Sequence, residues 1–368
     1  MDPLTAIQPK SVLAEVANNL RLSIDQLRHL AQNAESMFHA RAQRLVKGKM
    51  RQVDPPTRIG RDYLRRLNSY LQHKFPPHKI VHGGALGRSC YSSALVHCGK
   101  SVVVTLDIHS CYPSVNHQMV QSALMSRGCT VEDAEVLTSL LVIRGSLPQG
   151  SPASGSALNI VLHRLDEALF QYTSINGIRV SRTYDDIVLS CHDKATAEAA
   201  IEFLDLEISK TGLQFSRKKR KKKGLQLVSN AAGNPIQVHG FVVNSPKGVR
   251  IGPKNHFSAV TAAEKFSRAC KSVSPQSIEQ VALLRRKAMG HKHYCKPATY
   301  GPSKNISQHI RKGDRLVEKR LRDLGIISDS KPWYSMYAGV NEPRRIAGEW
   351  IKAISTAGPK QALCAGLQ

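Results

Sequence analysis

Acidic side chains are scarce in this chain of 368 residues, which contains 27 Asp and Glu against 53 Lys and Arg. The formal net charge is +26 at pH 7, and the isoelectric point is near 10.0. A field of this sign attracts polyanions, and nucleic acid is the first partner to expect. The competing polyanion is an anionic membrane surface. Binding there would require an apolar stripe beside the basic face, and the sequence shows none.

Long apolar runs are also lacking. No stretch of about 18 apolar residues could span a bilayer, and residues 1–10 lack the apolar core of a secretory signal. The eight cysteines are scattered and form no Cys-x-x-Cys pair, which argues against a disulfide framework and against a zinc site. We therefore expect a cytoplasmic protein with no membrane partner. Hydrophobic residues still make up 41% of the chain, which is enough for a packed core.

The pattern that is present alternates between helix and strand. Apolar residues have helical spacing in residues 11–45 and 157–170, and residues 255–325 are mostly helical and basic. Residues 102–106 form a β-branched apolar run that suits a buried strand. Residues 178–189 predict two further strands joined as a hairpin.

Three aspartates stand at the ends of these predicted strands. Asp107 follows the apolar run, and Asp185 and Asp186 are expected at the tip of the hairpin. Phosphoryl transfer from a nucleoside triphosphate to a hydroxyl group uses two divalent metal ions about 4 Å apart. Mg²⁺ prefers carboxylate oxygens and keeps several waters, so two or three aspartates suffice. The alternative is a solvated turn, because Asp is a common turn residue, and the Asp-Asp pair alone favours that interpretation.

The residues around these aspartates reverse that preference. Three segments, in this order, resemble the strand-borne aspartate motif, the Leu-Pro-Gln-Gly motif and the Tyr-x-Asp-Asp hairpin of reverse transcriptases. They are residues 104–115 (Val-Thr-Leu-Asp-Ile-His-Ser-Cys-Tyr-Pro-Ser-Val), 147–154 (Leu-Pro-Gln-Gly-Ser-Pro-Ala-Ser) and 182–190 (Arg-Thr-Tyr-Asp-Asp-Ile-Val-Leu-Ser). Any one of them is moderate support, and the ordered set is a strong signal.

The resemblance implies the fold class and its domains. A right-hand polymerase of the α+β class is expected, with fingers, an RRM-like αβ palm that carries the catalytic carboxylates, and a mostly helical thumb. The expected parts are an N-terminal helical segment over residues 1–45, fingers and palm over 46–250, a helical basic thumb over 251–325, and a tail of unknown role over 326–368.

The resemblance also implies the chemistry. The chain would be an RNA-directed DNA polymerase, a nucleotidyltransferase that uses two Mg²⁺ ions, with Mn²⁺ as a substitute. Asp107, Asp185 and Asp186 would be catalytic, and they would bind the metals together with the backbone carbonyl of Ile108.

Five residues are implied to bind the incoming deoxynucleoside triphosphate (dNTP). Arg51 lies in a fingers-like element, and a guanidinium suits phosphate because its planar donors bind bidentately. Tyr112, five residues after Asp107, would exclude ribonucleotides by a clash at the 2′ position. The alternative for Arg51 is an ordinary surface charge, and the alternative for Tyr112 is an aromatic residue of the core. Gln149, Gly150 and Lys219 complete the set, although the basic neighbours of Lys219 in the run 217–223 could replace it.

Two further elements are similar to those of retron reverse transcriptases. Residues 93–97 (Ser-Ala-Leu-Val-His) match an Asn-Ala-x-x-His element except at the first position, and residues 238–240 (Val-His-Gly) are similar to a Val-Thr-Gly element. The expected contacts with nucleic acid are Arg88, His97, Arg217, Lys218, Val238, His239 and Gly240.

A retron enzyme would bind its own structured noncoding RNA and start DNA synthesis from a 2′-hydroxyl of that RNA. The product would be branched RNA–DNA, and an effector or toxin protein would be a further partner in anti-phage defence. One alternative is another bacterial reverse transcriptase, of a defence or intron-related group, with different priming. The other is a catalytically idle RNA-binding scaffold.

The sequence departs from the family pattern at five positions. Thr183 and Tyr184 stand where the family has Tyr followed by a small residue, and Gly155 stands where proline is common. Ser93 and His239 depart from the retron elements. Tyr184 is bulky at a position near the primer terminus, so fidelity or substrate choice is expected to differ.

Overall fold

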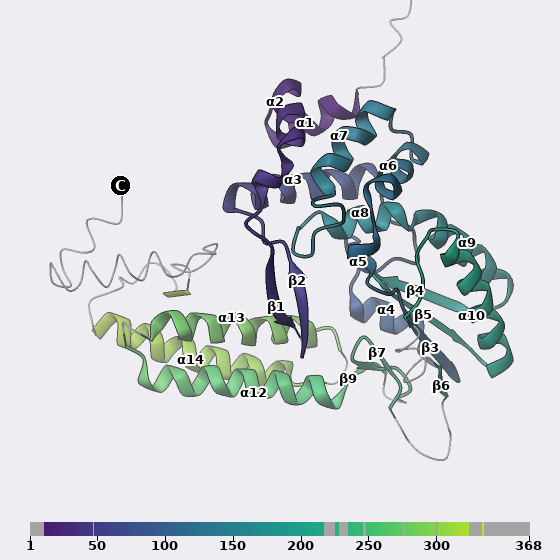
Figure 1. Ribbon diagram of the computed structural model, residues 1–368. Coiled ribbons are helices and arrows are strands. Elements are labelled where there is room, and N and C mark those ends of the chain that lie inside the picture. Colours follow the sequence, from purple (N-terminus) through teal and green to yellow (C-terminus); the bar gives the residue numbers. More distant parts are fainter. Residues whose placement is uncertain are drawn as a thin grey trace, which may run out of the picture. The chain divides into compact units, whose positions relative to one another are not determined.

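The computed structural model describes residues 11–46, 48–216, 225–227, 235–245, 248–274, 277–298, 301–323 and 333–334. The chain forms two compact units, Met1–His239 and Gly240–Gln368 (Figure 1). Among the described residues, no helix is both long enough and apolar enough to cross a membrane.

The first unit begins with a helical layer and a two-stranded hairpin. Its elements are α1 (Val12–Leu20), α2 (Ile24–Gln32), η1 (Ala34–Met37), β1 (Ala42–Val46), β2 (Lys49–Val53) and α3 (Arg58–Lys74). Ser23 caps α2 and exchanges two hydrogen bonds with Gln26, as a capping box does. The helix prediction for residues 11–45 is wrong at its end, because Ala42 already opens β1, which pairs with β2.

A four-stranded antiparallel sheet forms the centre of the first unit. Its strands are β3 (Val102–Asp107), β4 (Arg179–Thr183), β5 (Asp186–Cys191) and β6 (Leu225–Leu227), in the order β4-β5-β3-β6. The valine run of β3 is buried, as the sequence predicts. The predicted hairpin is β4–β5, but its two turn residues are Tyr184 and Asp185, whereas Asp186 is the first residue of β5.

Helices cover both faces of this sheet. Those that pack against its strands are α4 (Cys90–Val96), α9 (His163–Ile175) and α10 (Lys194–Ser209). The other helices of this part of the chain are α5 (Cys111–Ser114), α6 (His117–Ser126), α7 (Val131–Leu141) and α8 (Ser154–Val161) (Figure 1). Successive side chains of a strand point to opposite faces. On β4, Ser181 bonds to α4 and Arg182 bonds to α9, so these two helices lie on opposite faces. The helix predicted over residues 157–170 is two helices, because α8 ends at Val161 and Leu162 separates it from α9.

The second unit is mainly helical. Its elements are β8 (Phe241–Val242), β9 (Arg250–Ile251), α12 (Pro253–Ala269), η2 (Cys270–Ser272), α13 (Ile278–Cys295) and α14 (Ser303–Asp323), while β7 (Gln237–Val238) belongs to the first unit. The three long helices pack against one another. Gly313 allows α14 to approach closely, since a Cβ there would lie 2.5 Å from the ring of Phe266. The helical prediction for residues 255–325 agrees with these three helices.

Trp333 is fully buried within the second unit. Its Nε1 donates to Asp314 over 3.1 Å, and the same carboxylate accepts two bonds from Arg285. The guanidinium of Arg285 also lies 3.3 Å from the centre of the Tyr334 ring. Two residues of the tail whose role the sequence left open therefore contact α13 and α14.

Candidate active site

The sheet brings the three aspartates together at one end. Asp107 is the last residue of β3 and lies directly opposite Asp186, the first residue of β5. Directly opposed residues of an antiparallel pair have Cβ atoms roughly 5 Å apart on the same face. Asp185 precedes Asp186 in the turn, and its carbonyl accepts a 3.0 Å bond from the backbone N–H of Ile108. All three aspartates are partly exposed.

This arrangement suits Mg²⁺ better than a metal that needs a closed cage. Within the part of the chain that the structure describes, no three His, Cys, Asp or Glu side chains form a ready-made metal cluster. Mg²⁺ is usually bound through one or two carboxylates, with waters and substrate phosphates as its other ligands. The partly exposed carboxylates of Asp107 and Asp186 could therefore hold a divalent metal ion whose other ligands are waters or substrate oxygens.

The backbone of Ile108 is held by a segment beyond α10. The N–H of His109 donates to Gln214 over 2.8 Å, and the N–H of Ser216 donates to the carbonyl of Asp107 over 2.8 Å. These two bonds flank Ile108 and do not use its carbonyl. That oxygen is the one expected to bind a metal.

Tyr184 occupies space that two glycines provide. A Cβ at Gly155 would lie 2.7 Å from the Cε1 atom of Tyr184, and one at Gly84 would lie 3.2 Å from the same atom. The backbone of Tyr184 has a φ of 56°, a left-handed conformation that costs a non-glycine residue about 1 kcal/mol or more. The bulky turn residue and the glycine that replaces the common proline are thus in contact, and the two departures from the family pattern fit each other.

Tyr112 lies in α5, half-buried beside the turn. Burial, together with the charge of Asp185, raises the pKa of its phenol above the ordinary value. The ring therefore stays neutral and can present an uncharged face or edge to a substrate. Beneath it, burial raises the pKa of the Cys111 thiol to about 12, so this cysteine is a core residue rather than a nucleophile.

The Leu-Pro-Gln-Gly loop is joined to the end of β2. The N–H of Asp54 donates to the carbonyl of Gln149 over 2.9 Å. Gly150 has a φ of 121°, and a Cβ there would lie 3.1 Å from the Asp54 carbonyl oxygen. The carboxylate of Asp54, only 4% exposed, accepts bonds from Arg41 and Arg144. Sequence reasoning missed these three residues, because no motif contains them.

Comparison with known proteins identifies the family. The model of the family described as "Reverse transcriptase (RNA-dependent DNA polymerase)" matches residues 40–233, more than half of the chain. The chain belongs to the reverse transcriptase family. This match confirms the predicted fold class, a right-hand polymerase of the α+β class. It also confirms the predicted activity of the chain, that of an RNA-directed DNA polymerase. Enzymes of this family generally use divalent metal ions.

Several relatives of this reverse transcriptase are retron enzymes. The Retron Mx65 reverse transcriptase of Myxococcus xanthus is 26% identical in an alignment of 308 positions that covers 74% of this chain and 70% of that protein. The Retron Ec86 reverse transcriptase of Escherichia coli is 24% identical in an alignment of 254 positions that covers 66% of this chain and 77% of that protein. The predicted similarity to retron-type enzymes is confirmed.

Among solved structures, apo telomerase from Candida Tropicalis covers 92% of this chain, and the chain covers 73% of it, with a TM-score of 0.45 and 11% identity.

The other predicted site residues of this reverse transcriptase differ in their exposure. Arg51 is exposed on β2, directly opposite the exposed Arg44 of β1. Arg88 is only partly exposed, and its guanidinium donates to the carbonyls of residues 78, 79 and 81, so it closes the loop before α4. Arg217, Lys218 and Lys219 lie outside the described residues.

His97 and Val238 lie in the interior. Both ring nitrogens of His97 bond to serine hydroxyls, those of Ser190 and Ser181 at 2.8 and 2.7 Å, and the residue is 0% exposed. Burial lowers the pKa of His97 to about 3, so the imidazole is neutral near pH 7. Val238 is 1% exposed. In this structure His97 therefore holds α4 to the sheet, and contact with nucleic acid would have to come from exposed neighbours of these two residues.

His239 and Gly240 stand at the boundary between the two units. His239 has a φ of 49°, and burial lowers the pKa of its imidazole to about 4. Gly240 has a φ of 83°, and a Cβ there would lie 1.9 Å from Asn255. Its carbonyl accepts a bond from the N–H of Gly252. A side chain at position 240 would force Asn255 to move and would be strained by the left-handed backbone, so packing and conformation favour glycine there.

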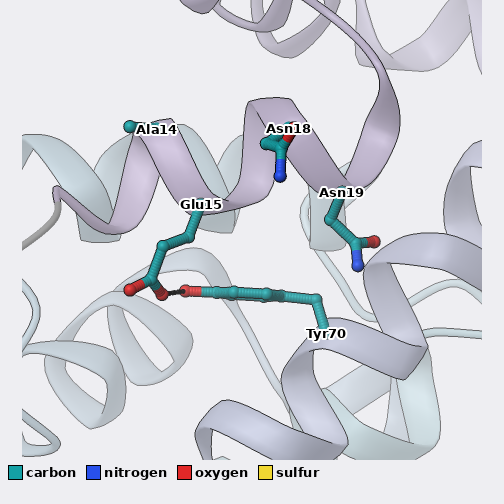
Figure 2. Close-up of a pocket in the computed structure, with 5 residues that line it drawn as sticks. All are labelled: Ala14, Glu15, Asn18, Asn19 and Tyr70. Carbon is teal, nitrogen blue, oxygen red and sulfur yellow. Dashed lines mark hydrogen bonds between the residues drawn. The ribbon is translucent and has the colours of Figure 1, made fainter.

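The pocket drawn in Figure 2 contains none of the predicted residues. It lies between α1 and α3 and is lined by Ala14, Glu15, Asn18, Asn19 and Tyr70. The hydroxyl of Tyr70 donates to Glu15 over 2.8 Å, and Lys74 pairs with the same carboxylate. Burial and this bond raise the pKa of Tyr70. This pocket is a gap between two helices, and its one carboxylate, that of Glu15, is paired with Lys74. It therefore lacks the cluster of carboxylates expected of the active site.

Proposed function

We propose that this reverse transcriptase copies part of a cognate structured noncoding RNA into single-stranded DNA, with Asp107, Asp185 and Asp186 as its catalytic residues. The observation that carries the proposal is the cross-strand pair of Asp107 and Asp186 with Asp185 in the adjoining turn. When bound, two Mg²⁺ ions would activate the attacking oxygen and stabilise the charge on the triphosphate. Mn²⁺ would be a substitute.

The chain's own residues would orient the substrates. The three carboxylates and the Ile108 carbonyl would hold the metals at the strand ends. Arg51, exposed on β2, would bind the triphosphate, with Lys219 as a second cation. Tyr112 would contact the sugar, and the loop of Gln149 and Gly150, tied to Asp54, would hold the base pair.

We further propose priming from a 2′-hydroxyl of the RNA, which gives a branched RNA–DNA product, and a role in anti-phage defence together with an effector protein. The retron relatives support this reading. The basic charge of the chain supports RNA as the partner, recognised by shape and phosphates rather than by base edges. The seven described cysteines are free thiols, which suits work in the reducing cytoplasm.

The test is to express the protein with its native flanking DNA and to purify it with its bound nucleic acid. That material is then treated with RNase, DNase or debranching enzyme. An Asp185→Ala/Asp186→Ala double variant is the negative control. The matched control is Asp25→Asn, which changes a 94% exposed aspartate of α2. DNA joined to RNA through a 2′ linkage, present in the control and absent in the double variant, is the expected result.

Two other outcomes would change the proposal. DNA without a branch would remove the priming proposal and favour a defence or intron-related enzyme with a different primer. If neither the wild type nor any variant makes DNA, even with dNTPs, Mg²⁺ and an annealed RNA template, the remaining interpretation is an RNA-binding scaffold.

A further inference from the structure

A fully buried arginine lies directly beside the catalytic turn. Arg182 of β4 and Asp166 of α9 are both 0% exposed. The Nε and Nη2 atoms of Arg182 donate to the two carboxylate oxygens of Asp166, each over 2.6 Å. A buried ion pair adds little net stability, because the cost of removing both charges from water offsets their attraction. The stability of the fold alone therefore does not account for this pair.

The remaining nitrogen of the guanidinium connects the pair to the turn. Nη1 of Arg182 donates to Oδ1 of Asn159 over 3.1 Å and to the carbonyl oxygen of Tyr184 over 2.8 Å. That carbonyl belongs to the peptide that joins Tyr184 to Asp185. The next carbonyl, that of Asp185, is bonded to the N–H of Ile108. Both peptides that flank Asp185 are thus held, one by a side chain and the other by the end of β3.

Arg182 is itself fixed from several sides. Its backbone N–H donates to Ile80 over 2.8 Å, and its carbonyl accepts a 2.7 Å bond from His82. The Asn159 side chain that receives Nη1 also donates to the carbonyl of Gly83 over 2.9 Å. Elements from distant parts of the chain therefore converge on one guanidinium plane. The turn that Arg182 holds is strained at Tyr184, whose backbone is left-handed. The bonds of Arg182 therefore help to keep the turn in this unfavourable conformation.

We propose that Arg182 is a positioning residue for the reaction. Through the Tyr184 carbonyl it sets the place of the Asp185 carboxylate, and Asp166 and Asn159 set the plane of the guanidinium. This inference rests on the proposed catalytic role of Asp185. A lysine cannot take the place of Arg182, because one ammonium group cannot present a planar fork to Asp166 and also reach Asn159 and Tyr184.

The decisive variant replaces the whole pair with apolar residues. In Arg182→Met/Asp166→Leu no buried charge is left unpaired, so the fold is expected to survive with a thermal midpoint near that of the wild type. The Tyr184 carbonyl, however, loses its donor. A misplacement of about 1 Å costs about 100-fold in rate, so single-turnover extension of a DNA primer on an RNA template should slow about 100-fold. The half-saturating Mg²⁺ concentration should rise.

The matched control is Arg179→Lys, on the same strand. Arg179 donates to the carbonyls of Val96 and Cys98 at 3.1 and 2.9 Å, on the α4 side. This variant should keep the wild-type rate and the wild-type Mg²⁺ dependence. Binding of Mn²⁺ without substrate, followed by electron paramagnetic resonance, gives a second readout that needs no turnover. It should weaken in the double variant and not in the control.

A folded Arg182→Met/Asp166→Leu variant with wild-type rate and wild-type Mn²⁺ binding would overturn the proposal, because the pair would then be only structural. If that variant does not fold, Arg182→Lys decides. It keeps a positive charge beside Asp166, and the proposal predicts a folded, slow enzyme with weakened Mn²⁺ binding, so a wild-type rate would overturn it. Asp185→Asn is assayed in parallel. If Asp185→Asn stays fully active, the proposed function fails at Asp185 itself, which separates that failure from a failure of Arg182.

Discussion

Two arginine–aspartate clusters hold the backbone of the proposed active site, and they differ in burial and in composition. The Arg182–Asp166 pair is fully buried, with one cation for one carboxylate. The Asp54 carboxylate is almost as hidden, but its two cations, Arg41 and Arg144, are 33% and 27% exposed. The first cluster holds the turn that bears Asp185, and the second joins β2 to the loop that bears Gln149.

The difference indicates how each part tolerates change. A buried pair has no water to replace a lost partner, so removal of one member leaves an uncompensated charge. In the open cluster a cation that loses its carboxylate can be solvated, and a second arginine remains if the first is removed. The turn that bears Asp185, proposed to be catalytic, is therefore expected to tolerate little change. The loop that bears Gln149 is held by ion pairs that can be weakened without unfolding the protein.

The largest effect is expected for Asp166→Asn. This change leaves the buried guanidinium of Arg182 without its counter-charge, at a cost of about 3–5 kcal/mol in the free energy of unfolding. Urea denaturation of the purified protein measures this loss. A loss below about 1 kcal/mol would show that water or another acid reaches Arg182, and the contrast between the clusters would disappear.

Asp54→Asn should cost less, about 1–3 kcal/mol, because its two arginines are partly exposed and can be hydrated. The backbone N–H at position 54 keeps its bond to the Gln149 carbonyl, but the strand end that bears it loses both ion pairs with arginine. We therefore expect the KM for dNTP to rise more than kcat falls in steady-state extension assays. A fall in kcat with no change in KM would place this cluster with the catalytic turn instead.

Gly155→Ala tests whether the turn is as tightly packed as the buried pair implies. The new Cβ would lie 2.7 Å from the Tyr184 ring, and overpacking of this kind costs about 1–3 kcal/mol. The double variant Gly155→Ala/Tyr184→Ala should lose less stability than the sum of the two single losses, because the ring that clashes with the new Cβ is gone. Additive losses in thermal unfolding would contradict direct contact between these two residues.

The smallest effect at neutral pH concerns His97, whose partners are uncharged serines. Because the folded protein disfavours the imidazolium form, the unfolded state binds more protons below pH 6.5. The contribution of His97 is fully present above pH 6.5 and is lost as the pH falls toward about 3, the folded pKa. His82, with a pKa lowered to about 4 by burial, adds to the same slope. A His97→Gln variant should show a shallower loss of stability between pH 6.5 and 4.5, and an unchanged slope would contradict the burial.

The parts that the sequence predicted are those whose signal is local. A valine run that ends in Asp107, and a hairpin that contains Asp185, place carboxylates at strand ends whatever the rest of the chain does. The break of the predicted helix at Leu162 and the early start of β1 depend on packing around them, which periodicity does not contain.

Local sequence signals did not predict the two arginine–aspartate clusters, because their members are far apart in the chain. Asp54 and Arg144 are 90 positions apart, and no motif contains either. Arg182 lies within a recognised motif, but its partner Asp166 is 16 positions away on a helix surface that looked only amphipathic. The motif around His97 suggested a contact with nucleic acid, whereas burial, which no motif records, places this side chain in the interior.

The most direct test of the account is extension of a DNA primer on an RNA template with dNTPs and Mg²⁺, by the wild type and three single variants. Asp107→Asn and Asp185→Asn each remove a charge that would hold a metal. Loss of several kcal/mol of transition-state stabilisation should slow extension by about a thousandfold or more. Asp25→Asn, at a 94% exposed aspartate, should extend at the wild-type rate. Wild-type extension by Asp107→Asn or Asp185→Asn would contradict the assignment of these carboxylates as the catalytic centre.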